Sequence, residues 1–137
     1  MSALRLAFFA VLLALALPGA AAEPDHWARI ASAVAAEIAK AEAMAVEGHA
    51  EEAKKALTRA YFGLFEDEKM EAALRKTFGF KHAYRREQEF GNLRKLIGKN
   101  EPVEIRRLSL ALRNALADDG RALDKAGVSP DVFEVNQ

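Results

Sequence analysis

Residues 25–47 have the sequence DHWARIASAVAAEIAKAEAMAVE. Apolar side chains recur in this stretch every three or four residues, which is the spacing of one face of an α-helix. The face consists of Trp27, Ile30, Ala31, Val34, Ile38, Ala41 and Ala45. Asp25 stands where an N-cap is expected, and Gly48 where a C-terminal cap is expected. The stretch therefore predicts an amphipathic helix over 25–47, whose apolar face needs other helices to cover it.

The rest of the chain repeats this pattern three times. The periodicity predicts further helices over about 49–78, 81–97 and 101–126, with breaks at Gly79, Gly98 and Gly127. Strong helix formers dominate throughout, and no segment has the alternating β-branched pattern of a strand. Four amphipathic helices with short connections predict an all-α fold, arranged as an antiparallel up-and-down four-helix bundle.

The first 22 residues have the order of a secretory signal peptide. Arg5 precedes an uncharged apolar run over 6–17, and Pro18-Gly19 is followed by Ala20-Ala21-Ala22. A positive start, an apolar run and small residues at the cleavage site, in this order, are typical of a secretory signal peptide. The run is shorter than the roughly 20 residues that a spanning helix needs. We therefore expect cleavage near Ala22 and a single helical domain over 23–137 in the periplasm, with no membrane-spanning segment after processing.

Composition argues against several classes of function. The chain has 20 Lys and Arg against 20 Asp and Glu, whereas a nucleic-acid-binding protein has an excess of basic residues. It has no cysteine, and therefore no thiol nucleophile, thiolate metal site or disulfide. Neither a nucleophile elbow nor a glycine-rich phosphate loop is present. We expect a protein that is not an enzyme and that does not bind nucleic acid.

Several carboxylates lie on or beside the predicted apolar faces. At about 100° per residue, Glu68 and Glu71 interrupt the stripe through Leu57, Leu64 and Phe78 on the helix predicted over 49–78. Glu66 falls on a second face with Phe62, Met70 and Ala73, and Glu87 lies beside Ala83 and Phe90 on the next helix. An isolated buried charge is costly, so these glutamates need partners or solvent.

Two interpretations of the glutamates remain open. In the first, they face solvent or pair with arginines, of which Arg75, Arg86, Arg94, Arg106 and Arg113 are available. In the second, carboxylates from facing helices converge and bind a hard cation through oxygen, with the Tyr61 hydroxyl as a further ligand. Fe³⁺, Mn²⁺ and Ca²⁺ all accept oxygen ligands, so spacing does not choose the metal. The histidines form no convincing ligand pair, and His82 is expected to be exposed in the first turn of its helix.

Two runs in the middle of the chain carry a family resemblance. They are AYFGLFE at 60–66, followed by Met70-Glu71, and AYRRE at 83–87, followed by FGNLRK at 90–95. In order and separation they resemble the periplasmic N-terminal domains of the bacterial high-affinity iron permease family. The resemblance covers about residues 60–97. That family transports iron through membrane helices with an Arg-Glu-x-x-Glu motif, whereas Arg86-Glu87-Gln88-Glu89 has a different spacing.

The resemblance implies a stand-alone version of the extracytoplasmic domain. Such a domain would bind iron, as Fe²⁺ or Fe³⁺, through the positions that match the acidic and tyrosine positions of the family, which are Glu66, Glu71, Glu87 and Tyr61. It would deliver the iron to, or dock on, a membrane iron permease or another periplasmic iron-uptake component. The alternative is a non-metal protein-interaction or chaperone-like module, whose partner-binding face would be Tyr61, Phe62, Phe65 and Met70.

Overall fold

The structure, a computed structural model, describes residues 24–132, and this part of the chain is all-helical. Its elements are α1 (His26–Val46), α2 (Ala50–Thr58), the π-helix η1 (Arg59–Glu66), α3 (Met70–Phe78), α4 (Phe80–Ile97) and α5 (Pro102–Lys125). The all-α prediction is confirmed. Residues 1–22, for which the sequence predicts a signal peptide, lie outside the described range.

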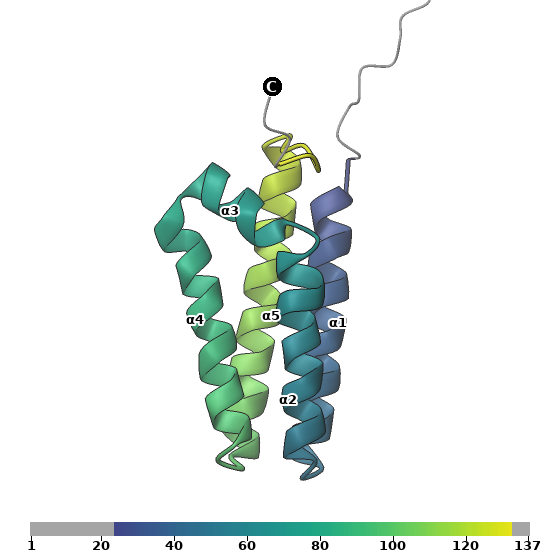
Figure 1. Cartoon of the computed structure of the whole chain (residues 1–137), viewed down its shortest axis with the longest axis vertical. Helices are drawn as coiled ribbons and strands as arrows, with labels where there is room; N and C mark the ends of the chain where they lie inside the picture. Colours follow the sequence, from purple (N-terminus) through teal and green to yellow (C-terminus); the bar gives the residue numbers. More distant parts are fainter. Residues whose placement is uncertain (1–23, 133–137) are drawn as a thin grey trace, which may run out of the picture.

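Four stretches of helix run along the long axis of the molecule (Figure 1). They are α1, α2 with η1, α4 and α5, while α3 lies across one end of the molecule. α1 packs along α5 and also contacts α2 and η1. α4 contacts α5, α2 and α3. The described residues thus contain a fifth α-helix that the sequence did not predict as a separate element.

The single helix predicted over 49–78 is wrong, because the chain changes direction within it. The backbone N–H of Asp67 donates to Phe62 O, that of Glu68 to Leu64 O, and that of Lys69 to Glu66 O. The hydrogen-bonded span thus shortens from five residues to three, and Lys69 then takes a left-handed conformation with φ of 66°. The predicted stripe does not continue past this break, so that Glu68 and Phe78 are exposed.

The core lies between the long helices and is closed at one end by α3. Its largest fully buried apolar side chains are Trp27, Phe65, Ile38, Met70, Leu74, Leu93, Ile105, Leu112, Leu116, Leu123 and Val34. Burial of such side chains supplies the main favourable free energy of folding. The apolar face predicted on 25–47 is confirmed, since six of its members are buried and Ile30 packs against them.

The first turn of α1 is capped by a residue from the other end of the chain. Asp25 stands at the N-cap but its side chain makes no capping hydrogen bond. Instead, the backbone N–H groups of Trp27 and Ala28 donate to the two carboxylate oxygens of Asp124, each at 2.9 Å. Trp27 Nε1–H donates to Val128 O at 2.8 Å, which fixes the segment after α5 against α1.

No helix within residues 24–132 combines the length and the hydropathy that crossing a membrane requires.

Candidate functional site

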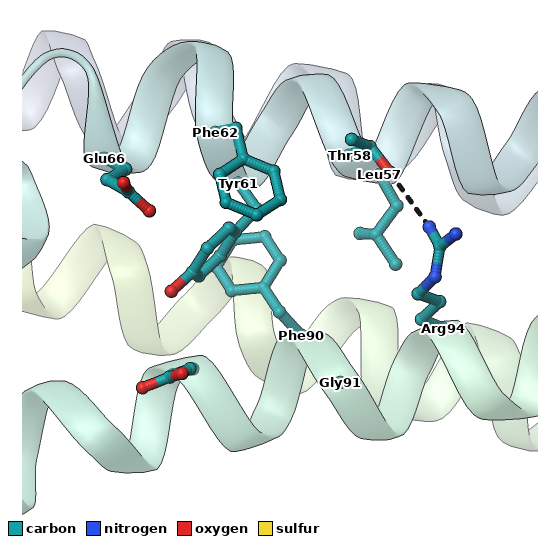
Figure 2. Close-up of a pocket in the computed structure, with 9 residues that line it drawn as sticks. Leu57, Thr58, Tyr61, Phe62, Glu66, Phe90, Gly91 and Arg94 are labelled. Carbon is teal, nitrogen blue, oxygen red and sulfur yellow. Dashed lines mark hydrogen bonds between the residues drawn. The ribbon is translucent and has the colours of Figure 1, made fainter.

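An open groove of about 610 Å³ lies between the α2–η1 stretch and α4. Its lining residues are Leu57, Thr58, Tyr61, Phe62, Glu66, Glu87, Phe90, Gly91 and Arg94. Three of the four residues that the sequence singled out as metal ligands, Tyr61, Glu66 and Glu87, therefore lie on one surface. Figure 2 shows the Tyr61 ring over the groove, with Glu66 on the same helix face and Phe90 beneath the ring.

The π-helical geometry of η1 places Tyr61 and Glu66 on the same side. In an α-helix, residues five apart differ by about 140° around the axis. In a π-helix the hydrogen bonds join residues five apart, so such residues become neighbours on one face. Both Tyr61 and Glu66 belong to η1 and both line the groove. Short π-helical segments are often found at functional sites.

An aromatic cluster holds the Tyr61 ring in place. The Tyr61 centroid lies 5.1 Å from that of Phe90 and 5.8 Å from that of Phe65. The Phe65 and Phe90 centroids are 5.5 Å apart, and both rings belong to the core. Phe62 packs edge-to-face on Tyr61 at 4.8 Å but is 55% exposed. Buried rings therefore anchor one side of Tyr61 and leave its hydroxyl in the groove, as Figure 2 shows.

The Tyr61 hydroxyl lies in a region of negative potential. Partial burial, together with the negative charges of Glu87, Glu71 and Glu66, raises its pKa to about 12. Both causes disfavour the phenolate, because burial and nearby negative charge each oppose a second anion. The charges of Glu66, Glu71 and Glu87, the three glutamates indicated by the sequence, thus all raise the pKa of Tyr61.

The three glutamates differ in their own partners. Glu66 and Glu87 are exposed, and neither carboxylate forms a hydrogen bond or an ion pair with another residue in the range 24–132. Glu71, on α3, is partly buried and forms an ion pair with Arg75, one helical turn later. Pairing with arginine therefore accounts for Glu71 and not for the two carboxylates that line the groove.

The arginines expected as partners form no ion pair with the two groove carboxylates. Arg94 lines the groove, but its Nη1–H group donates to Thr58 Oγ1 at 2.9 Å, the contact drawn in Figure 2, and to Lys54 O at 3.2 Å. Arg86 is turned into the protein, where it pairs with Asp119 and Glu89. Arg113 pairs with Glu42 on α1. The two groove carboxylates are therefore left available to an external cation.

The carboxylates do not form a preassembled metal centre. Among the described side chains, no group of three or more His, Asp or Glu lies close enough to hold a metal ion. The groove supplies two unpaired carboxylates and a phenol, which are hard oxygen donors suited to Fe³⁺, Mn²⁺ or Ca²⁺. The remaining ligands of a bound cation would be water or groups from a partner.

The face expected for a non-metal partner is not present as predicted. Phe65 and Met70 are fully buried, and Tyr61 is partly buried, so that only Phe62 of the four is exposed. The reason is the break after Glu66, which turns Met70 into the core at the start of α3. The groove therefore offers a partner one exposed aromatic ring rather than a continuous apolar face.

The sequence analysis did not indicate Asp119, whose carboxylate contacts two side chains of α4, those of His82 and Arg86. Asp119, on α5, is 4% exposed; its Oδ1 lies 2.7 Å from His82 Nε2 and its Oδ2 accepts from Arg86 Nε–H at 2.6 Å. The expectation that His82 is exposed is wrong, because the side chain is held by this contact and is 29% exposed. An aspartate on the core face of α5, in register with Leu112 and Leu116, was the available indication in the sequence.

Comparisons with protein-family profiles, with curated proteins and with solved structures find no match for this chain.

Proposed function

We propose that this protein binds iron reversibly in the groove between η1 and α4 and transfers it to a membrane partner outside the cytoplasm. Glu66 and Glu87 would provide the charged ligands, and the Tyr61 oxygen a third. The observation that carries this proposal is the pair of unpartnered carboxylates beside a tyrosine whose pKa is raised by burial and by three glutamates. Glu71 adds negative potential while it stays paired with Arg75.

The openness of the groove favours transient binding over storage. Affinity for a hard cation rises with the number of charged ligands and with the rigidity of the site. Two exposed carboxylates leave most of the coordination shell to water, so a partner with more oxygen ligands would extract the cation. Arg75, placed one turn from Glu71, would further limit the affinity because it compensates one of the three nearby negative charges.

Two features of the sequence support the proposed partner and location. The signal-peptide pattern at residues 1–22 and the resemblance of residues 60–97 to the periplasmic domains of iron permeases support an iron-uptake accessory in the periplasm. Its partner would be a membrane iron permease or another periplasmic iron-uptake component. In this proposal the long helices α1, α2–η1, α4 and α5 act as an antiparallel four-helix scaffold, and η1 and α4 carry the ligands.

A metal titration tests the proposal directly. Metal-free protein would be titrated with Fe³⁺ held in a weak soluble chelate, and separately with Fe²⁺ and Mn²⁺ without oxygen. Coordination of Fe³⁺ by the Tyr61 phenolate would produce a visible charge-transfer absorption, which Tyr61→Phe removes. Tyr84→Phe is the matched control, because Tyr84 is the other tyrosine of the chain and lies outside the groove.

The carboxylates are tested by a paired set of variants. Glu66→Gln with Glu87→Gln should weaken cation binding on the order of tenfold or more, because it removes both charged ligands. Glu47→Gln with Glu101→Gln removes the same charge from exposed positions outside the groove and should change little. The proposal is abandoned if neither iron nor manganese binds and the Glu66, Glu71 and Glu87 triple glutamine variant supports normal iron uptake.

The alternative function, a non-metal protein-interaction or chaperone-like module, rests on the exposure of Phe62. Its ring is 55% exposed at the rim of the groove. In that case Phe62→Ser would abolish binding of a protein partner, while the glutamine variants would not. Loss of partner binding in Phe62→Ser alone would therefore indicate the protein-interaction function, whereas loss of cation binding in the glutamine variants would indicate the iron function.

A further inference from the structure

The corner between α3 and α4 is a projecting elbow with almost no connecting loop. α3 ends at Phe78, α4 begins at Phe80, and Gly79 alone joins them with φ of 93° and ψ of 166°. A residue with a side chain rarely adopts this φ, so the sharp turn depends on the glycine. In Figure 1 the elbow extends away from α1, α2 and α5 at the end of the molecule.

The elbow exposes three aromatic rings to solvent. Phe80 is 62% exposed, Tyr84 43% and Phe78 41%. The Phe80 and Tyr84 rings stack at 5.6 Å with 13° between their planes, and Phe78 packs on His82 at 5.4 Å. These contacts order the rings in two pairs, Phe80 with Tyr84 and Phe78 with His82. Exposed large apolar groups that gather in one place usually mark a binding surface.

The same segment is basic in a chain whose charge is otherwise balanced. Residues 72–86 contain Arg75, Lys76, Lys81, Arg85 and Arg86 and no Asp or Glu, whereas the whole chain has 20 of each sign. Arg86 is buried against Asp119, and Arg75 pairs with Glu71 while lying 5.8 Å from the centre of the Phe80 ring. The other three cations, Lys76, Lys81 and Arg85, are exposed and form no ion pair with a described residue.

We propose that this elbow binds the surface of an anionic phospholipid membrane. Aromatic rings prefer the headgroup region of a bilayer, and Lys and Arg are attracted to anionic lipids. The elbow combines both on a convex corner, where the rings of Phe80 and Tyr84 can enter the headgroup region while the cations contact phosphates. Stable membrane binding usually needs two such contributions, because either one alone is weak. The positive charge of the elbow is complementary to an anionic lipid surface. Its convex shape also favours a membrane over a protein partner, because the anchor residues of protein interfaces typically fill pockets.

Binding at the elbow would bring the groove close to the membrane. Phe80 and Glu87 lie seven residues apart on α4, which corresponds to about 10 Å along the helix. Lipid binding itself does not depend on the proposed iron function. If both hold, the orientation would place the groove near the entrance of a membrane partner.

Vesicle flotation tests the proposal. Exported protein, with its N-terminus established by mass spectrometry, would be mixed at low salt with vesicles of phosphatidylcholine alone or containing phosphatidylglycerol. We expect binding to the phosphatidylglycerol vesicles only, and weakening as salt is raised. Lys76→Gln, Lys81→Gln and Arg85→Gln together should reduce binding by roughly tenfold or more, since each cation near the surface contributes roughly fivefold. Phe80→Ser should reduce binding without altering its salt dependence.

A matched charge control separates the elbow from net charge. Lys55→Gln, Lys95→Gln and Arg106→Gln remove three exposed cations from α2, α4 and α5 and should bind vesicles like the unaltered protein. The circular dichroism spectra of all variants should agree, because every substituted residue is exposed. The proposal is overturned if the unaltered protein fails to bind anionic vesicles at low salt, or if the two triple variants bind equally.

A photocrosslinker at position 80 provides a second criterion. Reaction with lipid in vesicles supports the proposal, whereas a specific protein adduct in cells, together with no vesicle binding, would reject it in favour of a protein surface. The elbow variants should retain iron binding, and the Glu66→Gln, Glu87→Gln variant should retain vesicle binding. Failure of one function is therefore distinguishable from failure of the other.

Discussion

Arg86 on α4 and Asp119 on α5 form a buried ion pair: Arg86 Nε–H donates to Asp119 Oδ2 at 2.6 Å and an Nη2–H donates to Oδ1 at 3.3 Å. Burial opposes the charge of the guanidinium, but the hydrogen bond and charge of Asp119, with those of Glu89, outweigh it and raise the Arg86 pKa. The pair joins α4 to α5. It also keeps Arg86 out of the groove, where its sequence neighbour Glu87 has no ion-pair partner among residues 24–132.

Removing the charge of Asp119 should destabilise the protein substantially. Asp119→Asn leaves the Arg86 guanidinium buried with only Glu89 to compensate it, and loss of one partner of a buried pair typically costs about 3 kcal/mol or more. Urea unfolding monitored by circular dichroism measures the change. Glu89→Gln, which removes the more exposed partner of Arg86, should cost less than about 1 kcal/mol. Equal losses for the two variants would contradict the role assigned to the buried pair.

Tyr61 should titrate with a pKa of about 12, above the ordinary 10.0. In a Tyr84→Phe background it is the only tyrosine, so the absorbance of tyrosinate reports on it alone. Adding Glu66→Gln and Glu87→Gln should lower its pKa part of the way to 10, because burial, the largest cause, remains. An unchanged pKa would show that the groove glutamates do not act on the hydroxyl.

The same shift predicts how stability depends on pH. Below pH 10 Tyr61 is protonated in both the folded and the unfolded chain and contributes no pH dependence. Between pH 10 and about 12 the unfolded chain loses this proton while the folded protein retains it, so the free energy of unfolding falls as pH rises. Tyr61→Phe should reduce this slope. An identical slope in the variant would assign the alkaline loss of stability to other groups.

Gly120 on α5 allows a close approach to α1. A Cβ at this position would lie 2.8 Å from Trp27 O and 2.9 Å from Ala31 Cβ. Gly120→Ala must therefore push α1 and α5 apart, at a cost of about 1–3 kcal/mol. Gly91→Ala on α4 is the matched control, because a Cβ there meets nothing within 4 Å, and it should stabilise the helix by up to about 1 kcal/mol. Thermal unfolding should shift in opposite directions for the two variants.

Asp124 should matter more to the start of α1 than Asp25 does. Asp124→Ala removes the acceptor for the N–H groups of Trp27 and Ala28 and should cost about 1–2 kcal/mol. Asp25→Ala loses only an exposed ion pair with Arg29 and should cost less than about 1 kcal/mol. Hydrogen exchange of the first turn of α1 localises the effect. Faster exchange in Asp25→Ala than in Asp124→Ala would contradict the greater role of Asp124.

The candidate site was predictable in part. The sequence identified Tyr61, Glu66, Glu71 and Glu87, and the charges of all three glutamates act on the Tyr61 hydroxyl. Carboxylates on or beside the apolar faces indicated this region, and the resemblance to the iron permease domains selected these four residues. It could not predict that Glu71 would pair with Arg75 while Glu66 and Glu87 line the groove, because this depends on how the chain turns between Glu66 and Met70.

The sequence by itself determined the helical fold and the positions at which most helices begin and end. Apolar spacing, helix-forming residues and the breaks at Gly79 and Gly98 are local properties, and helix formation depends mainly on local properties and on burying one face. Residues of 25–47 such as Val34 and Ile38 could therefore be placed in the core.

Only the tertiary structure decided the π-helix, the direction of α3 and the partners of the buried charges. Asp119 lies 33 residues from Arg86, and Asp124 lies 97 residues from Trp27. The change from α- to π-helical hydrogen bonding rotates Glu66 toward Tyr61, and one left-handed residue, Lys69, redirects everything after it. These choices depend on how helices distant in sequence pack together, which a local repeat of apolar residues does not encode.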